Sequence, residues 1–197
     1  WRDRRKPVRV VPVKPSACRY SREVPTIDLS TELRVATEAA RRAAAIQMER
    51  YENIERIEFK SEKDVVTEAD HLSEEAILET ISAAFPSDTF QAEESGESGE
   101  LTDRVWVIDP LDGTVNYANG IPYFAVSIGL VVEGEPVLGV VVDPARDELF
   151  SGIRGQGALL NGRSIRCAPQ ERLLDAVVHL GLPRSGCERQ NVRYREA

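Results

Sequence analysis

Apolar residues recur at helical spacing in the first half of the chain. Between Asp28 and about Ile54 they fall three or four positions apart, which predicts one long amphipathic helix. The segment Leu72–Phe85 repeats the pattern, and Pro86 ends it. Polar residues that suit an N-cap stand at the start of the first helix: Asp28, Ser30 and Thr31.

The middle of the chain changes to short runs of β-branched and other apolar residues, which predict strands. Glu133-Gly-Glu-Pro136 and Asn161-Gly162 are typical hairpin turns between such runs. Two helices followed by a mostly antiparallel meander indicate an α+β fold, with the helices layered on a sheet. The predicted strands are Ile57–Phe59, Thr89–Ala92, Arg104–Ile108, Phe124–Glu133, Pro136–Asp143, Glu148–Ile153, Ala158–Leu160 and Ser164–Arg166.

Composition divides the chain into three expected parts. Residues 1–25 are rich in Arg and Pro without periodicity, and we expect a basic, disordered leader. Residues 26–168 form the α+β domain, and residues 169–197 begin an incomplete second α/β domain with a strand at Ala176–Leu180. The net charge of −8 combines about +7 on residues 1–22 with about −15 on the remainder, and such an acidic body disfavours nucleic acid as a partner.

Two further features bear on location. No apolar run approaches the roughly 18 residues that a membrane-spanning helix needs, so we expect no membrane association through such a helix. The chain has three cysteines, an odd number without metal-type spacing: Cys18, Cys167 and Cys187. This pattern favours reduced thiols and a cytoplasmic protein.

The run Trp106–Tyr117 carries the clearest candidate chemistry. Its strand-like start ends in two carboxylates, Asp109 and Asp112, and Pro110 between them is expected to stop the strand. Clustered carboxylates beside small residues with accessible N–H groups suit a hard divalent cation and a phosphate. The pattern D-x-x-D-G is also an ordinary turn, and that reading stays open on these residues alone.

Two other acidic clusters fall at the ends of predicted elements. Asp70 stands where the N-cap of the second helix is expected, so a capping carboxylate is the alternative reading. Glu93 and Glu94 follow a short strand, a place where adjacent glutamates are usually solvated. Together with the aspartates of the Trp106–Tyr117 run, these clusters place carboxylates on three loops of one scaffold. Each magnesium ion takes only one or two carboxylates, so three such loops suit a site with two magnesium ions.

Three stretches together resemble the inositol monophosphatase family of magnesium-dependent, lithium-sensitive phosphatases. They are D-V-V-T-E-A-D (64–70), E-E-S (93–95) and W-V-I-D-P-L-D-G-T-V-N-Y (106–117). The resemblance extends from about Leu33 to Leu182. It implies hydrolysis of a small phosphate monoester, most directly inositol monophosphate, with two or three Mg²⁺ ions at a complete site.

The resemblance also implies which residues bind the metal. Glu93, Asp109 and the carbonyl group of Leu111 would ligate the first magnesium ion. Asp109 would bridge to the second ion, with Asp112 as a further ligand.

The remaining roles concern water and substrate. Asp70 and Thr114 would pair to orient or activate the attacking water, helped by Glu93. The N–H groups of Gly113 and Thr114 would hold the phosphate, assisted by a helix that begins there. Two residues, Lys60 and Glu94, would support the site.

This chain departs from the family pattern in two ways. Ala92 stands where a glycine is usual, which is tolerated if its φ is negative. The resemblance also implies about 100 further residues, with a W-D-x-A-x-G motif whose aspartate completes the second metal site. The 197 residues lack that motif, so we expect them alone to hold at most one complete metal site and to show little turnover.

Rival interpretations follow from this departure. One is a truncated, non-catalytic paralogue that binds metal or phosphate; another is fructose-1,6-bisphosphatase or histidinol-phosphatase activity. The expected partner is a small phosphorylated substrate, and family members are commonly homodimers.

Overall fold

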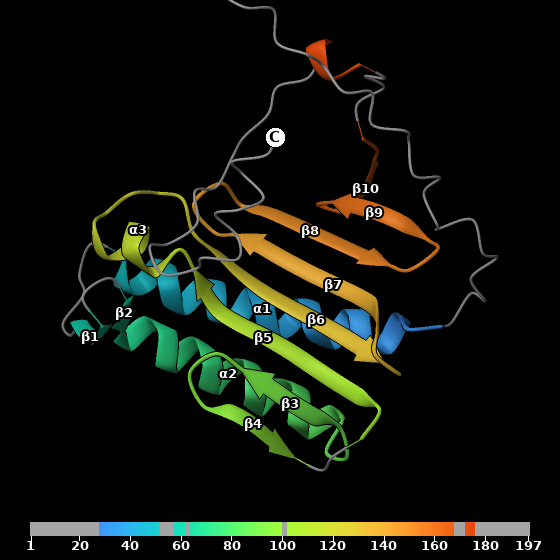
Figure 1. Cartoon of the computed structure of the whole chain (residues 1–197), viewed down its shortest axis with the longest axis horizontal. Helices are drawn as coiled ribbons and strands as arrows, with labels where there is room; N and C mark the ends of the chain where they lie inside the picture. Colours follow the sequence, from blue (N-terminus) through green and yellow to red (C-terminus); the bar gives the residue numbers. More distant parts are fainter. Residues whose placement is uncertain (1–27, 52–56, 62–63, 100–101, 168–171, 176–197) are drawn as a thin grey trace, which may run out of the picture. The chain divides into compact units, whose positions relative to one another are not determined.

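A computed structural model describes residues 28–51, 57–61, 64–99, 102–167 and 172–175 (Figure 1). The chain divides into two compact units, Trp1–Ile165 and Arg166–Ala197. In the second unit the described residues include one 3₁₀ turn, Leu173–Asp175. The expected leader and the expected strand Ala176–Leu180 lie outside the described residues, and both stay predictions.

Two long helices pack side by side in the first unit. Helix α1 spans Ser30–Arg50 and α2 spans Glu68–Ala84. The buried face of α1 consists mainly of alanine, which lets the helix approach its neighbours closely. The N-cap residue of α1 is Leu29, which was not among the three predicted candidates. Asp28 lies one residue before it, and its carboxylate accepts the Ser30 N–H at 3.0 Å.

Helix α2 begins four residues earlier than predicted. Thr67 is its N-cap residue, and Thr67 and Asp70 form a capping box. Asp70 is therefore the third residue of the helix, and its predicted place at the N-cap was wrong. The capping box explains the early start, because it satisfies N–H groups that the first turn otherwise leaves without partners.

An eight-stranded sheet carries the rest of the first unit, in the order β10-β9-β8-β7-β6-β5-β3-β4. All neighbouring strands are antiparallel except β3 and β5, so the predicted α+β class and meander are confirmed. The strands are β3 (Thr89–Ala92), β4 (Gly96–Gly99), β5 (Arg104–Asp112), β6 (Ala125–Val132), β7 (Glu135–Asp143), β8 (Glu148–Ile153), β9 (Gly157–Leu160) and β10 (Arg163–Ile165).

A separate two-stranded sheet precedes α2. It pairs β1 (Ile57–Ser61) with β2 (Asp64–Thr67) in antiparallel orientation. Neither β2 nor β4 was predicted. Both predicted hairpin turns are present: Glu133-Gly134 and Asn161-Gly162 have positive φ at both residues, as a two-residue hairpin turn requires.

The core lies between the helices and one face of the large sheet (Figure 1). Helix α1 packs against β6 and β7, and α2 packs against β5. Trp106 of β5 is fully buried there, and its indole N–H donates to Asp88 at 2.9 Å. Among the described residues, no helix combines the length and apolar character that crossing a membrane requires.

Strand β5 does not stop at Pro110. It continues to Asp112 through an irregularity, because Asp109 pairs with Ser127 and Asp112 pairs with Ala125. Three steps along β5 thus match two along β6, so β5 carries one extra residue, which is a β-bulge. The predicted strand end at Ile108 was therefore too early, and the two aspartates belong to the strand.

Gly113 turns the chain from β5 into the short helix α3 (Thr114–Ala118). Its φ of +92° lies in the left-handed region, where side chains with a Cβ are strained. A Cβ at this position would also meet the Tyr123 carbonyl oxygen at 2.9 Å. The backbone conformation and the close approach both require glycine here.

A pair of alanine variants separates these two effects. Gly120 has a similar φ of +68° but open space where a Cβ would stand, so Gly120→Ala introduces left-handed strain alone. We expect it to lower the free energy of unfolding by about 1–2 kcal/mol. Gly113→Ala should cost at least about 1 kcal/mol more, because the Tyr123 backbone must shift. Urea denaturation of both variants measures the difference, and equal losses would contradict the close-approach argument.

Candidate active site

Asp70 connects the start of α2 to α3. Its carboxylate is buried, and one oxygen accepts both the N–H and the hydroxyl of Thr67, at 2.7 and 2.6 Å. The other oxygen accepts the Thr114 hydroxyl at 3.0 Å. Burial raises the pKa of Asp70, and the hydrogen bonds from Thr67 and Thr114 oppose that rise. Asp70 therefore does both: its carboxylate belongs to the capping box of α2 and also accepts the Thr114 hydroxyl.

The Thr114 hydroxyl has two acceptors within reach. Its Oγ1 atom lies 3.0 Å from Asp70 Oδ1 and 3.0 Å from the carbonyl oxygen of Leu111. A hydroxyl has one hydrogen, so a proton directed at these acceptors leaves the oxygen lone pairs free to accept another donor. A water molecule is such a donor. The predicted pairing of Asp70 with Thr114 is present, whereas its role toward water stays a prediction.

Glu93 directly follows β3, and Asp109 lies in β5 at the start of the bulge. The Glu93 N–H donates to the carbonyl oxygen of Ile108 at 3.1 Å, which places Glu93 beside Asp109. The Asp109 carboxyl group lies within electrostatic reach of Glu93 and Asp112. Partial burial, followed by repulsion and hydrogen bonding from Glu93 and repulsion from Asp112, raises the pKa of Asp109 to about 7. Without a cation, Asp109 is therefore partly protonated near neutral pH.

The β5 bulge places Asp109 and Asp112 on the same face of the sheet. Residues three apart in a regular strand point to opposite faces. Here both aspartates pair with residues of β6 that lie two apart, Ser127 and Ala125, and so share one face. Pro110 and Leu111 between them are both buried. The bulge therefore brings both carboxylates to the side away from the buried core.

The donors that are present fit a magnesium ion of the family type. No three His, Cys, Asp or Glu side chains within the described ranges converge closely enough to hold a metal ion by themselves. Magnesium, however, takes one or two carboxylates and completes its octahedron with carbonyl, water and phosphate oxygens. Glu93, Asp109 and the Leu111 carbonyl offer such a set, and a cation would relieve the repulsion that raises the pKa of Asp109.

Helix α1 supports the bulge from behind. The buried Gln47 side chain donates to the Pro110 carbonyl oxygen at 2.6 Å, and the Tyr117 hydroxyl donates to the Gln47 carbonyl oxygen at 2.7 Å. Sequence reasoning missed Gln47. The available signal was its place one helical turn after Ala43 and Ala44, where a polar residue on an apolar face needs a buried partner.

The other predicted site residues have different positions. Gly113 is the N-cap residue of α3, and Thr114 is its first residue, so the Thr114 N–H has no intrahelical acceptor. The Glu94 N–H donates to Glu74 of α2. Lys60 lies in β1, and its side chain is outside the described part of the structure.

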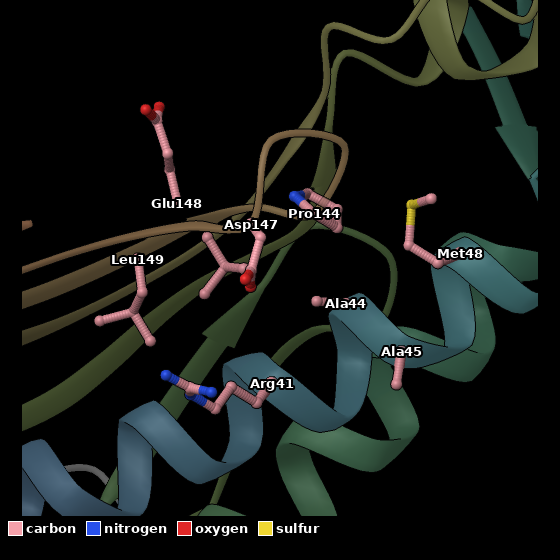
Figure 2. Close-up of a pocket in the computed structure, with 9 residues that line it drawn as sticks. Arg41, Ala44, Ala45, Met48, Pro144, Asp147, Glu148 and Leu149 are labelled. Carbon is pink, nitrogen blue, oxygen red and sulfur yellow. The ribbon is translucent and has the colours of Figure 1, made fainter. Parts of the chain in front are cut away.

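A cavity of about 260 Å³ adjoins Asp112. Gly113, Asn116 and Tyr123 also line it. A second cavity, of about 240 Å³, lies between α1 and the turn from β7 to β8 (Figure 2). Arg41, Met48 and Asp147 line the second cavity, which holds none of the predicted site residues. The first cavity is therefore the better candidate for a substrate.

The raised pKa of Asp109 makes the stability of the metal-free chain depend on pH. The folded chain favours protonated Asp109 over the ionised form. Protonated Asp109 therefore stabilises the fold most below about pH 4, where this side chain is protonated in the unfolded chain as well. That contribution decreases as the pH rises and is lost above about pH 7.

We therefore expect the thermal midpoint, measured with a chelator, to fall between pH 4 and pH 7, and Asp109→Asn to flatten this fall. Glu97→Gln, an exposed carboxylate change on β4, is the matched control and should leave the slope as it is. An Asp109→Asn profile parallel to that of the unchanged chain would contradict the assignment.

Known proteins resemble the chain over most of its described length. The model of the "Inositol monophosphatase family" matches residues 28–191. Inositol monophosphatase 2 of Solanum lycopersicum is 46% identical over 149 residues, which cover 73% of this chain and 56% of that protein. Nus factor SuhB of Pasteurella multocida is 43% identical over 154 residues, covering 77% of this chain and 58% of that protein.

Solved structures agree with this match. The extragenic suppressor protein suhB of Bartonella henselae superposes with a TM-score of 0.70 at 39% identity, over 73% of this chain and 57% of that one. The chain thus spans a little more than half the length of these relatives. Because the family model matches residues 28–191 and the tomato relative is 46% identical over 149 residues, this chain belongs to the inositol monophosphatase family.

Proposed function

We propose that the chain carries the phosphate-binding and water-orienting part of a magnesium-dependent phosphomonoesterase whose substrate is inositol monophosphate. The observation that carries the proposal is the Asp70–Thr114 hydrogen bond, together with the Glu93–Asp109 pair. Membership of the inositol monophosphatase family and the name of the tomato relative support the substrate class.

In this proposal Thr114 orients the attacking water. Its proton is held by Asp70, so the water donates a hydrogen to Thr114 Oγ1 and directs its own lone pair at the phosphorus atom. Asp70 itself is fixed by Thr67, which keeps the Thr114 hydroxyl in one orientation. Glu93 lies on the neighbouring loop and accepts the proton that the water loses as its oxygen bonds to phosphorus. The ester P–O bond breaks in the same displacement, and the leaving inositol oxygen takes up a proton from solvent water.

The phosphate group is held by the turn after β5. The N–H groups of Gly113 and Thr114 stand at the start of α3 and provide donors for phosphate oxygens. Glu93, Asp109, Asp112 and the Leu111 carbonyl would hold the magnesium ions, which when bound would neutralise the phosphate charge and activate water near neutral pH. The cavity beside Asp112 and Gly113 accepts the polyol part of the substrate.

Other properties stay predictions of the family resemblance and the sequence. These are lithium sensitivity, a cytoplasmic location, homodimerisation and the absence of nucleic-acid partners. The chain covers only a little more than half of its relatives, so turnover by the whole protein belongs to the proposal as well.

The proposal is tested in a chimera that supplies the expected remaining metal ligand. The chain up to Asn191, the end of its family match, is joined to the following part of the tomato inositol monophosphatase 2. We expect the chimera to release phosphate from inositol 1-phosphate with Mg²⁺ and the 197-residue chain alone to release little. Thr114→Ala and Asp70→Asn should each lower kcat by about 100-fold or more, because both disturb the orientation of the water.

The controls separate chemistry from folding. Asp103→Asn changes an exposed carboxylate on the loop before β5 and should leave kcat unchanged. Thr114→Ser keeps a hydroxyl and should restore most of the activity that Thr114→Ala loses. A folded chimera without activity, beside an active tomato enzyme, would favour the non-catalytic interpretation. Faster hydrolysis of fructose 1,6-bisphosphate or histidinol phosphate would instead overturn the proposed substrate.

A further inference from the structure

Glu74 of α2 is a buried carboxylate that the proposed chemistry does not use. Its side chain is 4% exposed. One carboxylate oxygen accepts the N–H of Glu94 at 2.8 Å, and the other accepts the N–H of Ser95 at 2.9 Å. Both distances fall in the range of charge-assisted hydrogen bonds, which are stronger than neutral ones. A buried carboxylate normally needs such partners, because its desolvation is costly.

The two N–H groups belong to the turn that carries Glu93. This turn, Glu93–Ser95, connects β3 to β4, and Gly96 after it has a φ of +78°. Glu93 and Ser95 are exposed, and so is every residue of β4. The turn therefore buries little apolar surface, and hydrogen bonds carry most of what fixes its position.

Glu93 is held between two anchors. On one side, its own N–H donates to Ile108 of β5. On the other side, the next two N–H groups of the chain are fixed by Glu74. The first anchor places Glu93 along β5, and the second fixes how the turn leaves the sheet. Together they hold Glu93 beside Asp109, the residue that follows Ile108 in β5.

We propose that Glu74 is a positioning residue for the metal site: by holding the Glu94 and Ser95 N–H groups, it fixes the Glu93 carboxylate where a divalent cation binds beside Asp109. This inference rests on the proposed function, since it concerns the same cation. Residues that orient metal ligands from behind typically change metal affinity by 10–100-fold when they are replaced. Glu74→Gln keeps the size of the side chain but replaces one acceptor oxygen with an NH₂ group, which cannot accept a hydrogen bond.

The experiment measures cation binding and local order in the 197-residue chain. Mn²⁺ serves as the probe, because it accepts the same oxygen ligands and its free form is counted by electron paramagnetic resonance. We expect Glu74→Gln to raise the Kd for Mn²⁺ by about 10-fold or more. Amide hydrogen exchange, followed by NMR, should speed up at Glu94 and Ser95, while the amides of β5 and β6 keep their protection. Glu75→Gln is the matched control, because Glu75 is the next residue of the same helix but is exposed.

Each outcome decides something different. If Glu74→Gln speeds exchange at both amides but leaves the Kd within threefold of that of Glu75→Gln, Glu74 has a structural role only and the inference is wrong. Unchanged exchange would also overturn it. If the unchanged chain binds no Mn²⁺ at millimolar concentration, the proposed function fails, and the inference fails with it.

If Glu74→Gln does not fold, Glu74→Asp replaces it in the experiment, because it keeps the charge but is too short to reach both N–H groups. It should weaken Mn²⁺ binding likewise, and wild-type affinity in that variant would overturn the inference.

Discussion

The extra residue in β5 is the constraint on which the site depends. Strand β5 has neighbours on both sides, and its inward residues Trp106 and Ile108 belong to the core between the sheet and the helices. Regular alternation would then send Asp109 and Asp112 to opposite faces, one of them into that core. The bulge lets two consecutive residues be buried and returns Asp112 to the face of Asp109. A strand that stabilises the fold thereby also presents two carboxylates to one cation.

The helices contribute polar groups as well as apolar surface. Asp70 completes the capping box of α2 and binds Thr114, so the beginning of a helix and the orientation of a candidate catalytic hydroxyl depend on one carboxylate. Gln47 of α1 contacts the β5 bulge, and Glu74 of α2 contacts the turn after β3. In all three cases a buried polar side chain holds a segment that carries candidate site residues. Stability and site geometry are therefore coupled in this part of the molecule.

Much of the fold followed from local patterns, whereas the support of the site did not. The bounds of β3 and β8 were predicted correctly, and the Asn161-Gly162 turn was recognised because only a few residues tolerate positive φ. Strand β4 was missed because Gly-Glu-Ser-Gly has no apolar alternation to reveal it. The role of Glu74 was missed for a different reason. Its partners are backbone N–H groups, which every residue except proline has, so no sequence letter marks them.

The two edges of the large sheet also affect how copies of the chain meet one another. Strand β4 forms one edge and β10 the other, and all seven of their residues are exposed. An exposed edge offers unpaired backbone groups to any other strand and is a common route to aggregation. Here both edges are short, one carries Glu97 between glycines and the other begins with Arg163. Within the described residues, each edge offers a foreign strand only three or four residues to pair with and presents a charge, so pairing there would gain little.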